Sequence, residues 1–279
     1  MLALIMFGVG LAITPADVAQ TFRYPKVFLS ALAAQMIGLP IIAALLHLVT
    51  PLSDEFKVGF IILAASPGGA TSGFLTYLWR GNVALSLSIT SVNSFLTLFS
   101  IPIVVNLGLM IFFGSSTDIH LPFWDTVGHI FLITIIPAGL GVVVRQRAPD
   151  WADQVAQPAK FIMLVLLALV FVFKVFAGES QGGAGLTWAD FVTLSPFALI
   201  QNLLCLSFGY FFLLWIGATH SSRLTAAMES GVQNTTLAFL IAGNLLNNES
   251  MVKPALVYSM FSFWTACLFA YFSNKIVSQ

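Results

Sequence analysis

The chain has 279 residues, of which 58% are hydrophobic and 8% are charged, with a mean hydropathy of +0.96 and a formal net charge of zero. Ordinary soluble domains carry about 25% charged residues, so this composition excludes a soluble domain and indicates a polytopic membrane protein. The balanced charge provides no field that would recruit nucleic acid, and Cys205 and Cys267 lack the spacing of a disulfide or metal site.

Nine apolar segments meet or approach the ~20 residues that a helix needs to cross a bilayer. They are residues 2–13, 27–50, 56–79, 82–113, 123–145, 157–177, 191–218, 223–246 and 252–274. The first is too short to span unless neighbours shield it or the bilayer thins, and we expect its beginning to be missing. We interpret the prolines in or beside the segments as kinks and helix starts; they are Pro40, Pro102, Pro137, Pro196 and Pro254.

The basic residues divide unevenly when the segments alternate across the membrane. One side carries Arg23, Lys26, Arg80, Arg145, Arg147, Lys160, Arg223 and Lys275, and the other carries Lys57, Lys174 and Lys253. Since loops rich in Lys and Arg stay in the cytoplasm, the larger group marks the cytoplasmic side. This predicts that the N-terminus and the 178–188 loop lie outside, and that the 145–160 loop and the C-terminus lie in the cytoplasm.

The third segment contains a helix stop followed by a restart. Its middle reads Ser66-Pro67-Gly68-Gly69, where Pro removes a backbone donor and the two glycines permit conformations that end a helix. Thr71 or Ser72 is expected to cap the second half-helix. The alternative is a single kinked helix, since Gly and Pro are common in membrane helices.

The eighth segment is interrupted by the polar run Glu229-Ser230-Gly231-Val232-Gln233-Asn234. A carboxylate at the centre of a membrane helix costs about 2.5–3.5 kcal/mol on insertion scales, so Glu229 needs a partner such as a cation. Gly231 can leave helical geometry at low cost, and the neighbouring polar side chains can satisfy freed backbone groups. We interpret the segment as a second broken helix; the alternative is a kinked helix whose Glu bonds to a neighbouring helix.

The two broken segments run in opposite directions, and each is the second in a run of three. This pattern is typical of an inverted-topology repeat in a secondary transporter. In such folds the half-helix N-termini attract anions and the loosened carbonyls hold cations. The sequence therefore predicts a binding site near the middle of the membrane.

Three motifs, ASPGGATSG, YLWRGNVALSLSITSV and MESGVQNTTLA, resemble those of the bile acid:sodium symporter family. The resemblance implies one all-α transporter domain over residues 1–279, with a core of residues 27–113 and 191–274 that holds two crossing broken helices, and a panel of residues 1–26 and 123–177. It implies sodium-coupled uptake of an organic anion, bile acid-like or a smaller carboxylate, by alternating access. The expected partners are this anion and the lipid bilayer, with no nucleic acid and no obligatory protein partner. The expected location is the bacterial inner (plasma) membrane.

The resemblance also assigns two sodium sites that share one carboxylate. The first is formed by Ser72, Ser86, Thr90 and Glu229, and the second by Gln35, Glu229, Gln233 and the carbonyl of Val232. Gly73 stands where better-known members have Asn, so the first site is expected to use water or a backbone carbonyl, to bind sodium weakly, or to be absent. The coupling ion Na⁺ prefers the oxygen ligands that these residues supply.

The residues themselves leave alternatives open. Ser86 and Thr90, at positions i and i+4, share one face of a helix, but their hydroxyls could bond back to carbonyls of their own helix. Gln35 alone would more often hold two helices together, as we expect of Asn93. The substrate carboxylate is expected to meet the half-helix N-termini around Thr71, Gly73 and Asn234.

The sequence shows no catalytic motif, so we expect a transporter and not an enzyme. The histidines, which are His47, His120, His129 and His220, lie where water is expected to reach them, and the tryptophans fit interfacial belts. One alternative is a proton-coupled or uncoupled carrier of the same fold, in which Glu229 titrates. Another is a non-transporting receptor or structural protein.

Overall fold

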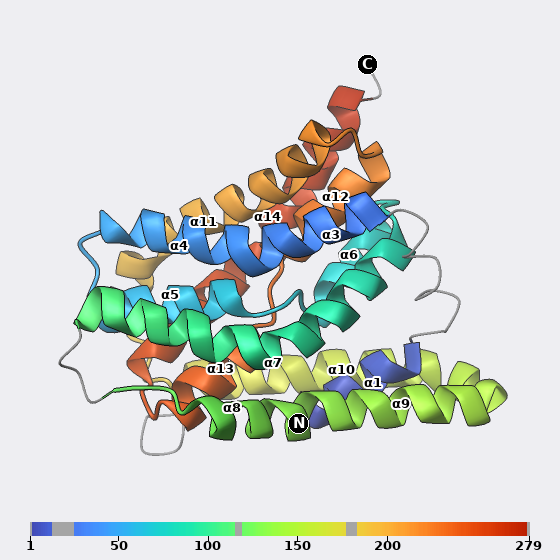
Figure 1. Cartoon of the computed structure of the whole chain (residues 1–279), viewed down its shortest axis with the longest axis horizontal. Helices are drawn as coiled ribbons and strands as arrows, with labels where there is room; N and C mark the ends of the chain where they lie inside the picture. The colour runs from blue at the N-terminus through green and yellow to red at the C-terminus, as the bar shows by residue number, and fades with distance from the viewer. Residues whose placement is uncertain (1, 13–24, 115–118, 177–182, 278–279) are drawn as a thin grey trace.

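The structure is a computed structural model that describes residues 2–12, 25–114, 119–176 and 183–277. Within these residues every regular element is a helix, apart from an isolated antiparallel bridge between Gly68 and Gln233. Long helices run across the molecule in Figure 1. The predicted all-α architecture of a polytopic membrane protein is confirmed.

Five helical spans in the described part of the chain are long and apolar enough to cross a membrane, and they coincide with five of the predicted segments. The first comprises α3 (Pro25–Ala33), the π-helical turn η1 (Ala34–Gly38) and α4 (Leu39–Leu48). The others are α7 (Val83–Phe113), α8 (Phe123–Ile130) with η2 (Phe131–Ile135) and α9 (Ile136–Arg147), α11 (Trp188–Trp215), and η5 (Ser250–Val252) with α14 (Lys253–Val277).

Two prolines lie where a span is locally widened. The π-helical turns η1 and η2 end just before α4 and α9, which carry Pro40 and Pro137 in their first two positions. Proline lacks the amide that would bond to the preceding turn and crowds the carbonyl there, so a wider turn relieves the contact. Pro254 lies in the first turn of α14, which confirms its interpretation as a helix start.

The third and eighth predicted segments are each broken. The third forms α5 (Asp54–Ala65) and α6 (Ala70–Leu78), and the eighth forms α12 (His220–Gly231) and α13 (Thr235–Phe239), which continues as the π-helical turn η4 (Leu240–Leu245). Each half is too short to cross a membrane alone, since about 20 helical residues are needed. The alternative of a single kinked helix is therefore wrong for both segments.

The helices gather in two groups. The short α1 (Leu2–Ala12) packs against α9 and α10 (Pro149–Phe176), and these helices lie with α8 along the lower edge of the molecule in Figure 1. The broken helices pack instead among α4, α7, α11 and α14. The division into panel and core and the inverted repeat within the core both stay predictions.

The panel helices α1 and α9 touch through their backbones. A Cβ on Gly10 would lie 2.0 Å from the carbonyl oxygen of Ala138, and one on Gly141 would lie 2.2 Å from that of Phe7. Small residues allow this close approach in membrane proteins, where van der Waals packing drives helix association. The contact gives the short α1 the neighbour that it needs.

Each lysine assigned to the outer side forms an ion pair with an acidic residue of the same side. The Nζ atoms of Lys57, Lys174 and Lys253 lie 3.1, 3.2 and 3.1 Å from carboxylate oxygens of Asp54, Glu249 and Asp190. Two of the pairs, Lys174–Glu249 and Lys253–Asp190, join different segments at one predicted membrane face, whereas Lys57 and Asp54 lie on one helix; the order of crossings stays a prediction. Which face is cytoplasmic stays a prediction.

We expect a cysteine at Ser53 to react with an impermeant thiol reagent from outside only, and a cysteine at Gln146 from inside only. Both side chains are exposed; residues 178–182 of the predicted outer loop lie outside the described residues. The measurement is labelling of intact cells and of inverted vesicles, in a chain whose Cys205 and Cys267 are replaced by alanine. The opposite labelling pattern would reverse the predicted orientation.

Candidate functional site

The two helix breaks cross in direct contact. The Gly69 amide donates a hydrogen bond of 2.9 Å to the carbonyl of Val232, and the Asn234 amide donates one of 2.8 Å to the carbonyl of Pro67. Backbone groups that a helix break frees inside a bilayer have no water to bond to. Each break therefore supplies hydrogen-bond partners for backbone groups that the other break frees. The crossing brings the N-termini of α6 and α13 to one place in the core.

The restart after the first break is not capped as predicted. The N-cap of α6 is Gly69, without a side-chain cap. The hydroxyl proton of Ser72 lies between two acceptors, the carbonyl oxygen of Gly69 at 2.6 Å and Oε1 of Glu229 at 2.7 Å. Because that hydroxyl holds a carboxylate, capping by Thr71 or Ser72 was the wrong prediction. At the second break Oδ1 of Asn234 does cap its helix, accepting from the Leu237 amide at 3.1 Å.

A buried carboxylate lies where the two breaks meet α7. Glu229 is 1% exposed, and it accepts hydrogen bonds from Ser72 and from two residues of α7. Ser86 Oγ donates to Oε1 at 2.5 Å and Thr90 Oγ1 donates to Oε2 at 2.8 Å. The structure thus brings all four side chains of the predicted first sodium site together, although the ion itself stays a prediction.

The neighbouring hydroxyls of α7 behave differently. Ser88 and Ser91 donate to the carbonyls of Ala84 and Leu87 in their own helix. This is the bonding that the alternative interpretation predicted for Ser86 and Thr90. The face at i and i+4 that carries Ser86 and Thr90 turns to Glu229 instead, so the alternative is wrong for this pair. These hydroxyl oxygens keep lone pairs that a cation can use.

No Lys, Arg or His within the described ranges forms an ion pair with Glu229. Removing a charge from water without a counter-charge costs several kcal/mol, even after relaxation. Three neutral hydroxyls share the negative charge but do not cancel it. The surroundings of Glu229 therefore fit a bound cation with oxygen ligands, which is how Na⁺ is held.

The residues of the predicted second sodium site lie at the same crossing of the two breaks. Gln35 lies near Glu229, and its Oε1 accepts from Asn93 Nδ2 at 2.6 Å. Gln233 is 4% exposed, and both its Oε1 and its Nε2 lack a partner among the described residues. The Val232 carbonyl is already bonded to Gly69.

Unpaired buried polar atoms are rare, because each costs about 1–3 kcal/mol. Gln233 Oε1 is such an atom, and so is Oδ1 of Asn93. Oxygen atoms that receive no hydrogen bond are the kind of ligand that a hard cation prefers. The hydrogen bond to Gln35 also agrees with the expectation that Asn93 holds two helices together.

Gly231 ends α12, but for a different reason from the predicted one. Its φ is not in the left-handed region, so conformational freedom is not what the position requires. A Cβ there would lie 2.4 Å from two carbons of Leu206. The glycine is needed because α11 packs directly against the end of α12.

Sequence reasoning missed the side chains that hold the end of α12. The Gly231 carbonyl accepts from Asn202 Nδ2 of α11 at 2.8 Å and from the Tyr258 hydroxyl of α14 at 2.9 Å. Thr265 donates to Oδ1 of Asn202 at 2.5 Å and so fixes the amide. An Asn within an apolar membrane segment was the signal that could have revealed this network.

One expectation about the histidines is corrected. His47 is fully buried; its Nε2 lies 2.8 Å from Oε1 of Gln201, and its ring stacks on Phe60, so water does not reach it. His220 bridges Tyr210 and Asn274. Trp79 is half-buried and packs against the core, and the interfacial role of the tryptophans stays a prediction.

We expect Gly73→Asn to strengthen sodium binding. A Cβ at Gly73 would lie 3.6 Å from Ser86 Oγ, an ordinary contact, so an Asn side chain can enter and offer an oxygen to the first site. A bond to a charged group contributes about 1.5–3 kcal/mol, and about 1.4 kcal/mol is tenfold in affinity. The sodium dependence of thermal stability should shift to about tenfold lower concentration. Gly73→Ala is the control, and equal behaviour of the two variants would contradict the prediction.

The model of the family described as Sodium Bile acid symporter family matches residues 1–182. The "Probable sodium/metabolite cotransporter BASS1, chloroplastic" of Oryza sativa subsp. japonica is 26% identical over 264 residues, covering 91% of this chain and 60% of that protein. The "Uncharacterized sodium-dependent transporter YocS" of Bacillus subtilis (strain 168) is 24% identical over 279 residues, covering 99% and 82%. The "Ileal sodium/bile acid cotransporter" of Oryctolagus cuniculus is 24% identical over 272 residues, covering 96% and 76%.

These similarities bear on the expectation that the chain is not an enzyme. All three names describe transporters, so the prediction of a transporter and not an enzyme is confirmed. The chain spans 60% of the length of the rice relative. The Bacillus match covers 99% of this chain and therefore includes the second break, which lies beyond the residues that the family model matches.

Proposed function

The chain belongs to the Sodium Bile acid symporter family, and on this premise we propose that it couples sodium influx to the uptake of an organic anion by alternating access. The observation that carries the proposal is Glu229, a buried carboxylate with three hydroxyl donors and no cationic side chain paired with it in the described part of the chain. A sodium ion supplies the missing charge. The relatives' names, which combine sodium with metabolite or bile acid, support the same coupling.

Charge balance explains why transport of the anion would need sodium. Two Na⁺ ions, the Glu229 carboxylate and one monovalent carboxylate substrate sum to zero. Moving an uncompensated charge through a low-dielectric core is costly, so the loaded protein changes conformation more readily than the partly loaded one. In the proposed cycle Ser72, Ser86 and Thr90 orient the carboxylate, and Gln35 and Gln233 supply neutral oxygens for the second ion.

The proposed substrate contacts lie at the N-termini of the two half-helices. Thr71 and Gly73, both half-buried, belong to the first turns of α6, where helix amides lack intrahelical partners and attract anions. Asn234 precedes α13, and its backbone amide is bonded to Pro67. The predicted free amide at that position is therefore absent, and the side-chain Nδ2 is the donor left for the anion.

We expect Asn234→Asp to weaken binding of the substrate anion more than Asn234→Leu. Asp keeps the oxygen that caps the Leu237 amide, but it replaces the amide donor by a negative charge that repels the anion. Leu removes the cap, at a stability cost of about 1 kcal/mol, without adding a charge. Substrate-induced thermal stabilisation in saturating sodium measures the effect. Equal anion affinity in both variants and the parent would place the substrate elsewhere, such as between core and panel.

The experiment that tests the function is uptake of labelled carboxylates into proteoliposomes. Uptake should follow an inward sodium gradient and fail when choline replaces sodium. Uptake driven equally by a proton gradient in choline would favour the proton-coupled carrier, and binding without any counterflow would favour a receptor. A screen of organic acids, from pyruvate-sized carboxylates to bile acids, identifies the substrate.

The chain is an integral membrane protein, and we place it in a bacterial inner membrane. We also propose that the N-terminus lies outside and the C-terminus lies in the cytoplasm. The support is the excess of basic residues on the side that carries Arg80, Arg145 and Arg223. The substrate and the lipid bilayer are the partners that this function requires.

A further inference from the structure

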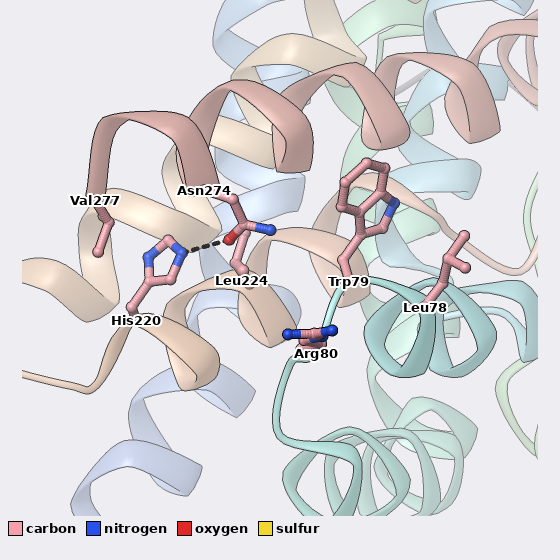
Figure 2. Close-up of a pocket in the computed structure, with 7 residues that line it drawn as sticks. All are labelled: Leu78, Trp79, Arg80, His220, Leu224, Asn274 and Val277. Carbon is pink, nitrogen blue, oxygen red and sulfur yellow. Dashed lines mark hydrogen bonds between the residues drawn. The ribbon is translucent and has the colours of Figure 1, made fainter. Parts of the chain in front are cut away.

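A hollow of about 530 Å³ opens where α6 ends, α12 begins and α14 ends. It lies at the opposite end of α12 from Glu229, on the predicted cytoplasmic side. Figure 2 shows its lining, which is Leu78, Trp79, Arg80, His220, Leu224, Asn274 and Val277. The lining combines apolar walls with nitrogen donors and contains no carboxylate, so its chemistry suits an anion with an apolar part.

Arg80 is held in an unusual conformation at the edge of this hollow. Its φ is 58°, in the left-handed region that residues other than Gly and Asn adopt at a cost. Its side chain is exposed, and its guanidinium has no hydrogen bond or ion pair within the part of the chain that the structure describes. A strained backbone that carries an unpaired cation points to a role for the cation itself.

A second donor is fixed in place by its neighbours. The Tyr210 hydroxyl lies 3.0 Å from Nδ1 of His220, and Nε2 of His220 lies 2.7 Å from Oδ1 of Asn274. Since Oδ1 accepts from the imidazole, the amide nitrogen of Asn274 faces the other way, toward Trp79 in Figure 2. That nitrogen has no partner in the described ranges, and neither does the indole N–H of Trp79.

The surroundings of the hollow are those of a membrane surface. Tyr77, Phe272 and Ile276, next to the lining residues on α6 and α14, are 72%, 58% and 74% exposed. Apolar side chains that flank a cation at a helix end match a lipid, whose acyl chains lie against the protein while its headgroup meets the cation. Anionic lipids of the cytoplasmic leaflet attract basic residues at this level.

We propose that the hollow between the ends of α6, α12 and α14 binds the phosphate headgroup of an anionic phospholipid, with Arg80 and Asn274 as donors. The headgroup lies between the end of half-helix α6 and the start of half-helix α12. The bound lipid therefore links the two broken helices away from their crossing. The site is separate from Glu229, and the proposal does not depend on which ion or anion is transported.

The test is lipid retention by the purified full chain in neutral detergent, measured by native mass spectrometry together with the thermal midpoint. The probes are phosphatidylglycerol, phosphatidylcholine and inorganic phosphate. Arg80→Gly and Arg80→Asn remove the cation and suit the left-handed backbone, so both should fold. Arg80→Lys keeps the charge, and Arg147→Ala removes an exposed charge from the same predicted side.

Phosphatidylglycerol should be retained and should raise the thermal midpoint, and phosphatidylcholine should do neither. Arg80→Gly and Arg80→Asn should lower the affinity for phosphatidylglycerol about tenfold, as expected for one charge-assisted hydrogen bond, whereas Arg80→Lys and Arg147→Ala retain most of it. Equal retention by the parent and Arg80→Gly would overturn the proposal, as would equal effects of the two lipids. Full stabilisation by inorganic phosphate alone would reveal a site for a free anion and no lipid site.

Discussion

Glu229→Gln is expected to abolish sodium-driven accumulation of the anion while leaving the protein folded. Gln keeps the shape, and its carbonyl can take the place of Oε1, which accepts from Ser72 and Ser86. Its amide then faces Thr90, whose hydroxyl must turn to accept, at a cost of about 1 kcal/mol. Losing one partner of a buried ion pair costs about 3–5 kcal/mol, and about 1.4 kcal/mol is tenfold, so sodium affinity should fall at least about 100-fold.

The measurement is uptake in a sodium gradient, with thermal stability recorded at increasing sodium concentration. Ser91→Ala is the matched control, because its hydroxyl lies on α7 like those of Ser86 and Thr90 but bonds back to Leu87. The control should transport as the parent does. Sodium-dependent uptake by Glu229→Gln at the parent rate would remove the carboxylate from the mechanism.

Gly68→Ala is expected to cause a comparable loss of sodium coupling although it replaces none of the proposed ligands. A Cβ at Gly68 would lie 2.1 Å from Oε2 of Glu229, so the carboxylate must move away. That oxygen accepts from Thr90, and the displacement breaks this contact. Because the obstructing atom is the end of a flexible side chain, folding should survive, at the cost of about 1–3 kcal/mol typical of overpacking.

The control for this variant is Gly73→Ala, which adds the same methyl group to the neighbouring half-helix at an ordinary distance from Ser86. Sodium should still raise the thermal stability of Gly73→Ala and should have no effect on Gly68→Ala. A Gly68→Ala protein that responds to sodium like the parent would show that the position of Oε2 does not matter.

Local signals made the architecture predictable from the sequence. A run of apolar residues of bilayer length indicates a spanning helix wherever it occurs, and a Pro-Gly-Gly run or a central carboxylate indicates a break. The same holds for Ser86 and Thr90, since residues at i and i+4 share a helix face whatever surrounds them. These inferences depend on neighbours within one helix.

The contacts within the candidate site were beyond such reasoning, because they join residues far apart in the chain. Ser72 has the composition of a capping residue, and only the arrival of Glu229, 157 positions away, turns its hydroxyl into a carboxylate donor. His47 was expected to meet water at a segment end, yet Gln201 on α11 covers it. The sequence alone suggests conformational freedom at Gly231, whereas packing against Leu206 is what requires the glycine.

Equilibrium binding of radioactive sodium to the purified parent protein and to Glu229→Gln tests most directly whether the buried carboxylate at the crossing is the sodium site. The parent should bind sodium saturably, with a Hill coefficient above one if both sites fill and near one if Gly73 has removed the first. Glu229→Gln should bind none at concentrations that saturate the parent. Sodium binding by Glu229→Gln with the stoichiometry and affinity of the parent would contradict the shared-carboxylate mechanism.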